Sequence, residues 1–159
     1  MSKSIHITRQ YSNILVIYYK SEYEIGGFIK VSKEIRWIIP YINLVEGILP
    51  QIKKLDSVRT MRTSYVKRDR CYGETNFFVD GTFTIKVRTK FQKIDFYPLS
   101  VTILPFSKLD ILFTLAHELA HLKHYEHTPE HKLLECQILS VFMYKLKSMG
   151  YKSEEEELK

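Results

Sequence analysis

The residues with the clearest chemical potential are His117, Glu118 and His121, which form the pattern His-Glu-Leu-Ala-His. Residues four apart lie on one face of a helix, so the two imidazoles can present nitrogens to a single ion. The Glu118 carboxylate stands one position along and can take a proton from water bound to that ion. Zinc suits this arrangement because it lowers the pKa of its bound water from 15.7 to about 7. The pattern therefore predicts a zinc site with Glu118 as general base.

A catalytic zinc usually has three protein ligands, and a third histidine is close at hand. Five of the six histidines fall within the fifteen residues 117–131. His127 lies six residues after His121, a spacing that lets the chain leave the helix, turn and return a side chain to the same ion. The spacing favours His127 as the third ligand. His124, His131 or water alone remain open for that position, although an outer or surface role suits both histidines better.

Glu135 is the main rival, because it lies fourteen residues after His121, as in short gluzincins. If Thr128 caps the final helix, Glu135 lies about 10 Å along that helix from its cap. We therefore do not expect His127 and Glu135 to bind the same ion.

Two helices must position these side chains. The apolar run 109–116 would bury the back of the metal-binding helix, and Ser107 can cap its start. Thr128, Pro129 and Glu130 are typical of a helix start, which predicts a final helix to about Gly150. Earlier in the chain, Ser32 resembles an N-cap before apolar residues at helical spacing, and Pro40 and Pro50 predict a kinked helix or two pieces.

Strands are expected in the first two thirds of the chain. Residues 6–19 indicate one or two strands, and 28–31 a short one. Asp80-Gly81 stands between alternating apolar and polar residues in 76–88, which predicts a hairpin. The fold class is therefore α+β, and strand 82–88, if it is an edge, could pair with an extended peptide laid across the metal.

These residues together resemble the small zincin metallopeptidases of the SprT, WLM and YgjP-like families. Their pattern is a hairpin with an extended strand, then His-Glu-x-x-His, then a third histidine in a turn like His127-Thr128-Pro129. The resemblance is specific over 109–135, suggestive over 73–108 and absent over 1–60. It implies a zincin-like fold and zinc-dependent hydrolysis of peptide bonds in a peptide or protein substrate. It further implies His117, His121 and His127 as ligands and Glu118 as general base. Some of these relatives act on DNA-associated proteins.

Several further residues are open candidates for supporting roles. Tyr125, His124 or Tyr144 could stabilise the oxyanion, and the sequence does not choose between them. Acidic side chains near the ligands could accept a hydrogen bond from a ligand imidazole; these are Asp110, Glu126 and Glu130.

Length and composition predict one folded domain over residues 1–159, with residues 151–159 as a disordered acidic tail. No window approaches eighteen consecutive apolar residues, so we expect no membrane span. The first ten residues lack the apolar core of a signal peptide. Two cysteines, Cys71 and Cys136, make no disulfide framework, so we expect a cytoplasmic protein with reduced thiols.

The formal net charge is +6, and much of the basic excess lies between residues 53 and 93. The basic residues of this stretch are Lys53, Lys54, Arg59, Arg62, Lys67, Arg68, Arg70, Lys86, Arg88, Lys90 and Lys93. Such a stretch with interleaved aromatics could bind a nucleic-acid backbone, but no recognised motif accompanies it, which favours a solvated basic face.

The alternative function is a non-catalytic zinc- or nucleic-acid-binding regulatory module, similar to the ImmA/IrrE type or a degenerate protease. Glu118 favours the enzyme, because a structural zinc site has no use for an adjacent base.

Overall fold

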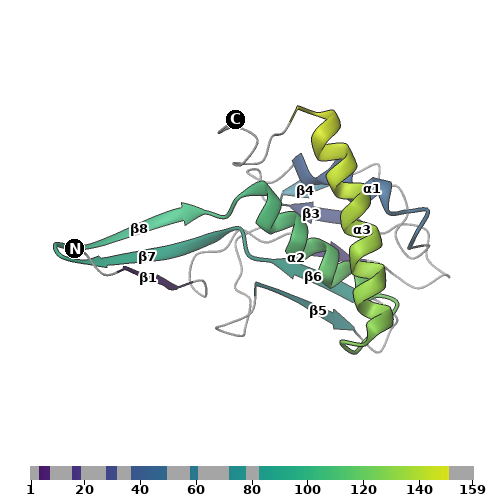
Figure 1. Ribbon diagram of the computed structural model, residues 1–159, viewed down its shortest axis with the longest axis horizontal. Helices are drawn as coiled ribbons and strands as arrows, with labels where there is room; N and C mark the ends of the chain where they lie inside the picture. The colour runs from purple at the N-terminus through teal and green to yellow at the C-terminus, as the bar shows by residue number, and fades with distance from the viewer. Residues whose placement is uncertain are drawn as a thin grey trace.

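The computed structural model describes residues 4–7, 16–18, 28–31, 37–49, 58–60, 72–77 and 83–150. In these parts strands precede two long helices, which confirms the α+β class (Figure 1). The expected acidic tail, 151–159, lies outside the described residues, as does the Asp80-Gly81 turn. None of the described helices is both long enough and apolar enough to cross a membrane.

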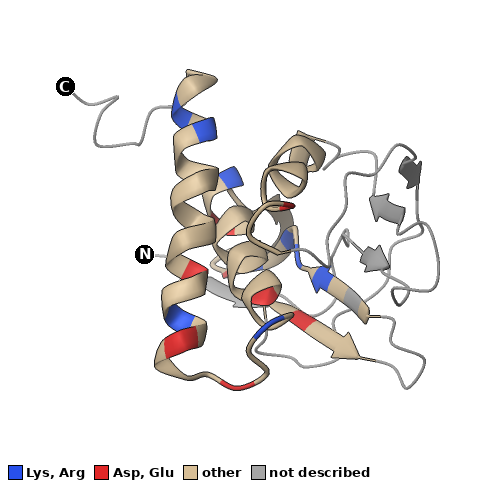
Figure 2. Ribbon diagram, turned by 90° about the vertical axis from the view of Figure 1, so that its right-hand side faces the viewer, with Lys and Arg blue, Asp and Glu red and all other residues tan. Residues whose placement is uncertain are grey.

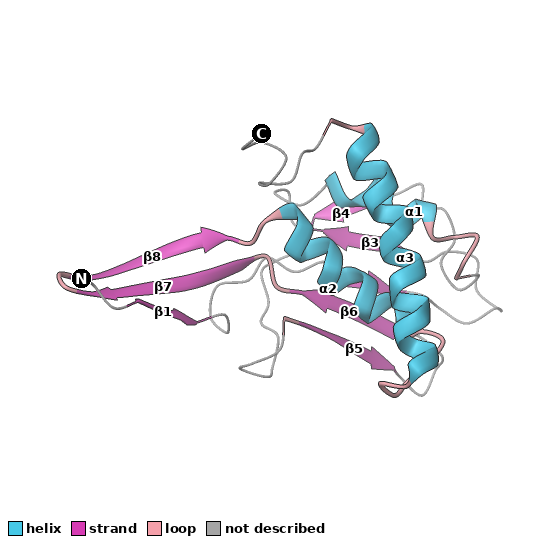
Figure 3. Cartoon of the chain, in the orientation of Figure 1, coloured by secondary structure: helices cyan, strands magenta, loops and turns pink. Residues whose placement is uncertain are grey.

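The described strands form three small sheets (Figure 3). In the first, β7 (Lys90–Phe96) lies between β1 (Ser4–Ile7) and β8 (Leu99–Pro105), and both pairings are antiparallel. In the second, β3 (Phe28–Val31) pairs antiparallel with β2 (Val16–Tyr18) and parallel with β4 (Val58–Thr60). In the third, β5 (Gly73–Phe77) pairs antiparallel with β6 (Phe83–Val87). The β5–β6 pairing agrees with the expected hairpin.

Each long helix begins at the residue that the sequence indicates. Helix α2 spans Lys108–Ala120, and its N-cap Ser107 accepts a hydrogen bond from the backbone N–H of Asp110 at 3.1 Å. Helix α3 spans Pro129–Ser148, and its N-cap Thr128 accepts from the backbone N–H of His131 at 3.2 Å. Both caps satisfy backbone donors that have no partner inside the helix.

Helix α1 is shorter than the apolar pattern in 35–49 suggests. It spans Ile39–Leu44, and Pro40 lies in its first turn, where the missing N–H costs no intrahelical bond. The expected N-cap, Ser32, lies outside the described residues.

One core joins α1, β6, α2 and α3. Helix α2 contributes most of its buried face to this core, and β6 contributes Phe83, Ile85 and Val87. The rings of Tyr41 in α1 and Phe142 in α3 meet edge to face at a centroid distance of 5.9 Å. This packing fixes α2 against both α3 and the β5–β6 pair.

Candidate metal centre

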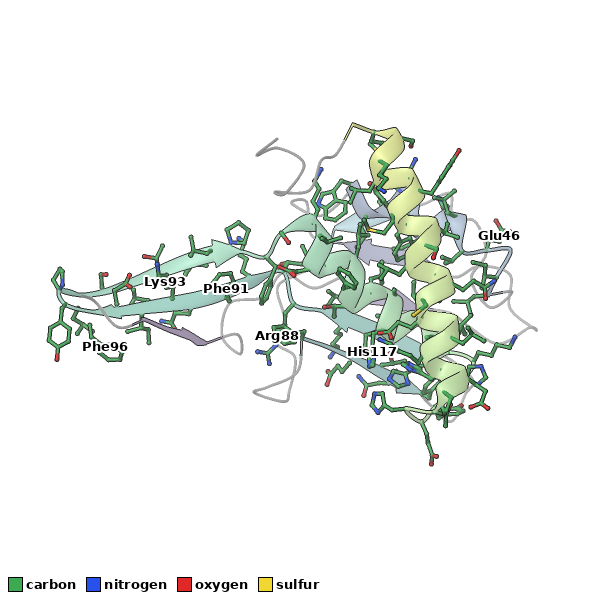
Figure 4. The ribbon with its side chains drawn as sticks, in the orientation of Figure 1. Glu46, Arg88, Phe91, Lys93, Phe96 and His117 are labelled. Atoms are coloured by element: carbon green, nitrogen blue, oxygen red, sulfur yellow. The ribbon has the colours of Figure 1, made fainter. Side chains whose placement is uncertain are left out.

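Three histidine rings converge where α2 ends. The Nε2 atom of His117 lies 3.3 Å from Nε2 of His121 and 3.1 Å from Nε2 of His127. His117 and His121 come from successive turns at the end of α2, and His127 returns from the segment that leads to α3. Figure 4 shows His117 in this group of ring nitrogens at the C-terminal end of α2.

Hydrogen bonds at the other ring nitrogens determine which atoms of two histidines carry protons. Nδ1 of His117 lies 2.8 Å from Oε1 of Glu135, and Nδ1 of His121 lies 3.1 Å from the carbonyl oxygen of His124. A carboxylate and a carbonyl only accept, so both Nδ1 atoms donate, and the neutral rings carry lone pairs at Nε2. These two lone pairs face each other across 3.3 Å. A cation between them would relieve the repulsion.

The spacing of the nitrogens also fits zinc. With Zn–N distances of 2.0–2.1 Å and tetrahedral angles, ligand nitrogens lie about 3.3 Å apart. The two Nε2 distances, 3.1 and 3.3 Å, agree with this value. Burial also lowers the pKa of His121, which favours the neutral form that can bind a metal.

A fourth histidine packs behind the first three. One ring nitrogen from each of His117, His121 and His131 lies within 4.8 Å of the other two, which is close enough to hold a metal ion. The His131 ring is buried, its Nε2 lies 3.1 Å from the carbonyl oxygen of His117, and burial lowers its pKa. That nitrogen donates to an oxygen that only accepts, so its bond holds the last turn of α2. His131 is therefore a candidate for the third ligand through its other ring nitrogen, and His127, whose Nε2 lies 3.1 Å from that of His117, is another.

Glu135 occupies an outer position. Its Oε1 bonds His117, and its Oε2 lies 2.9 Å from Nζ of Lys132. Burial raises the pKa of this carboxyl, but the hydrogen bonds from Lys132 and His117 outweigh that effect and lower it. An ionised carboxylate that receives Nδ1–H fixes the orientation of the ring, as outer carboxylates do for metal-binding histidines.

Glu118 turns its carboxylate toward strand β5. Only 6% of this residue is exposed, and the Thr75 hydroxyl donates a hydrogen bond to its Oε2. Burial raises the pKa of Glu118, while the bond from Thr75 and the nearby His117 oppose the rise. Such a shift brings the pKa of a carboxyl closer to the range in which it can exchange protons near neutral pH.

Gly73 permits this close approach of strand and helix. A Cβ atom at Gly73 would lie 2.8 Å from Cγ2 of Thr114, 2.9 Å from the carbonyl oxygen of Lys86 and 3.0 Å from Cγ of Glu118. Sequence reasoning did not identify Gly73 or Thr75. A glycine inside a strand is the available signal, because it often marks the close approach of another backbone.

A groove of about 720 Å³ runs between β5 and α2 past the histidines. The side chains of His117, Glu118, His121 and His127 line it together with all of β5. The strand that borders the site is therefore β5. The expectation for strand 82–88 depended on that strand being the edge there, and no residue of β6 lines the groove. Four aromatic side chains line the rest of the groove: Tyr72, Phe77, Phe113 and Tyr125.

The other residues that were predicted to support the site differ in whether they lie at the groove. Tyr125 lines the groove, and its ring lies 4.5 Å from that of Phe77 between centroids. Tyr144 is 80% exposed on α3 and does not line the groove. Asp110 accepts from the Ser107 hydroxyl at 2.9 Å near the start of α2, far along the helix from the histidines. His124 contributes its backbone carbonyl to His121.

The described basic residues do not gather into one surface. Arg88 is buried, Lys86 lies 3.7 Å from Glu74, and Lys93 lies 4.0 Å from Asp95. Figure 2 shows the Lys and Arg positions of the described ribbon spread over several elements. Residues 53, 54, 62, 67, 68 and 70 lie outside the described residues, and only the backbone of Arg59 is described, so the predicted basic face stays a prediction.

Comparison of the chain with models of protein families, with curated proteins and with solved structures found no match.

Proposed function

We propose that this protein is a zinc-dependent metallopeptidase. The observation that carries the proposal is the shared groove, in which Nε2 of His121 and Nε2 of His127 both lie within 3.3 Å of Nε2 of His117, beside the buried carboxylate of Glu118. A structural metal site needs the nitrogens alone. The adjacent base and the open groove add what hydrolysis requires, a proton acceptor and room for a substrate.

His117, His121 and His127 would hold the zinc through Nε2, with Glu135 and the His124 carbonyl orienting two of the rings. Zinc bound there would lower the pKa of a water ligand toward neutrality and polarise the scissile carbonyl. Glu118 accepts the proton of the attacking water and later delivers it to the leaving amine. The hydrogen bond from Thr75 limits the rotamers of Glu118, so this proton acceptor stays on the groove side of α2.

Strand β5 offers the substrate a backbone to pair with. Among the described residues its only strand partner is β6, and its other side borders the groove. An extended peptide can add to such an edge through main-chain hydrogen bonds, while alternate side chains contact the groove walls. This geometry supports an unfolded or extended segment as the substrate. Of the three predicted oxyanion donors, Tyr125, His124 and Tyr144, Tyr125 is the one that lines the groove, where its hydroxyl could donate a hydrogen bond to the developing oxyanion.

The test compares the zinc-loaded protein with its Glu118→Gln variant on an unfolded protein substrate, with cleavage products identified by mass spectrometry. We expect fragments from the wild type and none from the variant, at equal zinc content and equal thermal stability. Equal cleavage by both proteins, or none by a zinc-loaded wild type across varied unfolded substrates, would contradict the proposal. In the second case a regulatory module with a structural metal would be the better reading.

A further inference from the structure

The sheet formed by β1, β7 and β8 projects from the helices as an arm (Figure 1). Phe91 lies near its base and Phe96 near its tip (Figure 4). Strand β7 is paired on both sides, by β1 and by β8. Strand β8 is the last strand of the sheet, so its outer edge has no strand partner among the described residues. Because N–H and C=O groups alternate in direction along a strand, half of those of β8 face outward.

Apart from Pro105 at its last position, the outer edge lacks the features that usually prevent strands from pairing between molecules. Natural edge strands are commonly short, or carry charges, proline or bulges. Strand β8 is seven residues long, Leu-Ser-Val-Thr-Ile-Leu-Pro, and has no charged residue. All of its residues except Leu104 are exposed, and Leu99, Val101 and Ile103 are 73%, 54% and 47% exposed. Such an edge is a template for another strand.

The register of the sheet sorts its side chains into two faces. Leu99, Val101 and Ile103 lie opposite Phe96, Ile94 and Gln92 of β7, so one face is mainly apolar. Ser100 and Thr102 lie opposite Asp95 and Lys93, so the other face is polar toward the tip. A strand that extends this sheet must therefore alternate in the same way.

We propose that the strand that pairs with this edge is β8 of a second copy of the chain. A two-fold axis perpendicular to the sheet and beside Thr102, midway between the two strands, places Thr102 opposite Thr102 of the second copy and Val101 opposite Ile103. This antiparallel pairing keeps the apolar side chains of both copies on one face, and it sets two β-branched residues side by side, a favourable cross-strand pair. The result is a six-stranded sheet shared by two molecules, an isologous contact.

Charge restricts the ways in which two copies can associate. Each copy has a formal net charge of +6, so a contact between the bodies of two molecules would be repulsive. Antiparallel pairing of β8 puts the bodies at opposite ends of the shared strands, about 20 Å apart along six residues. That separation is more than twice the Debye length of about 8 Å at physiological ionic strength. Because a seven-residue edge buries less than a standard interface, we expect a dimer that dissociates on dilution.

Cross-linking tests the register directly. In a Cys71→Ser, Cys136→Ser background, Thr102→Cys would place two thiols opposite each other with Cα atoms about 4.5–5.5 Å apart, within disulfide range. The matched control is Ser100→Cys on the same strand and face, whose two copies would lie about 14 Å apart. We expect the Thr102→Cys protein to form at least ten times more disulfide dimer than the control under mild oxidation. Equal cross-linking of the two would overturn the proposal.

Sedimentation velocity over a concentration series tests the association without any cysteine. We expect concentration-dependent dimers of the wild type and at least a tenfold weaker dimer of Thr102→Lys, which sets like charges against each other. Leu133→Lys, on an exposed site of α3, adds the same charge and should dimerise like the wild type. A wild type that stays monomeric at its highest soluble concentration, or a Thr102→Lys protein that dimerises like Leu133→Lys, would overturn the proposal. Neither readout depends on zinc or peptidase activity.

Discussion

The carboxylate of Glu135 lies 2.8 Å from Nδ1 of His117, on the side of the ring opposite the converging Nε2 atoms. One side chain of α3 thereby fixes the orientation of a side chain of α2. The sequence alone makes Glu135 the main alternative to His127 as the third metal ligand. In the structure Glu135 lies at the outer nitrogen of His117 and His127 lies at the inner one, which is the arrangement expected if His127 is the ligand and Glu135 is not.

Replacement of Glu135 therefore tests this division of roles. We expect Glu135→Ala to weaken zinc binding about 10–100-fold, the usual effect of losing an outer partner. His127→Ala should weaken it further, because it removes a nitrogen from the ion. Competition with a chromophoric chelator measures both affinities. The opposite ranking would make Glu135 the ligand.

Thr75 should position the general base. Thr75→Val removes the hydroxyl that donates to Glu118, and Thr75→Ser keeps it. A hydrogen bond to a charged group contributes about 1.5–3 kcal/mol, so we expect peptidase kcat to fall at least about tenfold in Thr75→Val at unchanged zinc content. Thr75→Ser should restore most of that loss. A serine variant as slow as the valine variant would show that the hydroxyl is not what matters.

Gly73 should be required for the packing of β5 on α2. A methyl group there would lie 2.8–3.0 Å from atoms of Thr114, Lys86 and Glu118. Two of these residues, Thr114 and Glu118, line the groove. We expect Gly73→Ala to lower the free energy of unfolding by about 1–3 kcal/mol, as overpacking does. Gly47→Ala is the control, because nothing lies within 4 Å of its added Cβ. Urea denaturation compares the two, and equal midpoints would contradict the tight approach.

The metal-free protein should lose stability on mild acidification. Burial lowers the pKa of His121 and of His131, so the folded state binds fewer protons there than the unfolded state, whose histidines titrate near 6.5. Stability should then fall as the pH drops from about 7 to 5. Burial raises the pKa of Glu118, which acts in the opposite direction.

This opposition gives the pH experiment its control. Urea unfolding of metal-free wild type and Glu118→Gln across this pH range should show a steeper loss in the variant, because it lacks the compensating carboxyl. A variant whose stability is flat with pH would mean that the two histidines are not held neutral by burial.

The sequence predicts the local elements that carry their own signals. Ser107 and Thr128 are N-caps as expected, because a hydroxyl before an apolar helical run satisfies free N–H groups wherever the helix packs. The convergence of His117 and His121 follows from helical periodicity alone. Such features depend on neighbours in the chain.

Features that depend on distant neighbours were missed. The contact of Thr75 with Glu118 joins residues 43 apart, and no local pattern predicts it. The β7–β8 hairpin turns at Tyr97-Pro98, without the Asn-Gly or Asp-Gly signal that marks 80–81. The sequence does not show that β5 borders the groove, because alternation indicates which residues share a face and not which strand lies nearest the site.

Metal content measured by elemental analysis tests the central claim most directly. The protein is purified without a histidine tag, beside His121→Ala and the control His124→Ala, which keeps the backbone carbonyl that His121 uses. We predict one zinc per chain in the wild type and in the control, and its loss in His121→Ala. A folded wild type that neither contains zinc nor takes it up, or a His121→Ala variant that retains it, would contradict the metal centre.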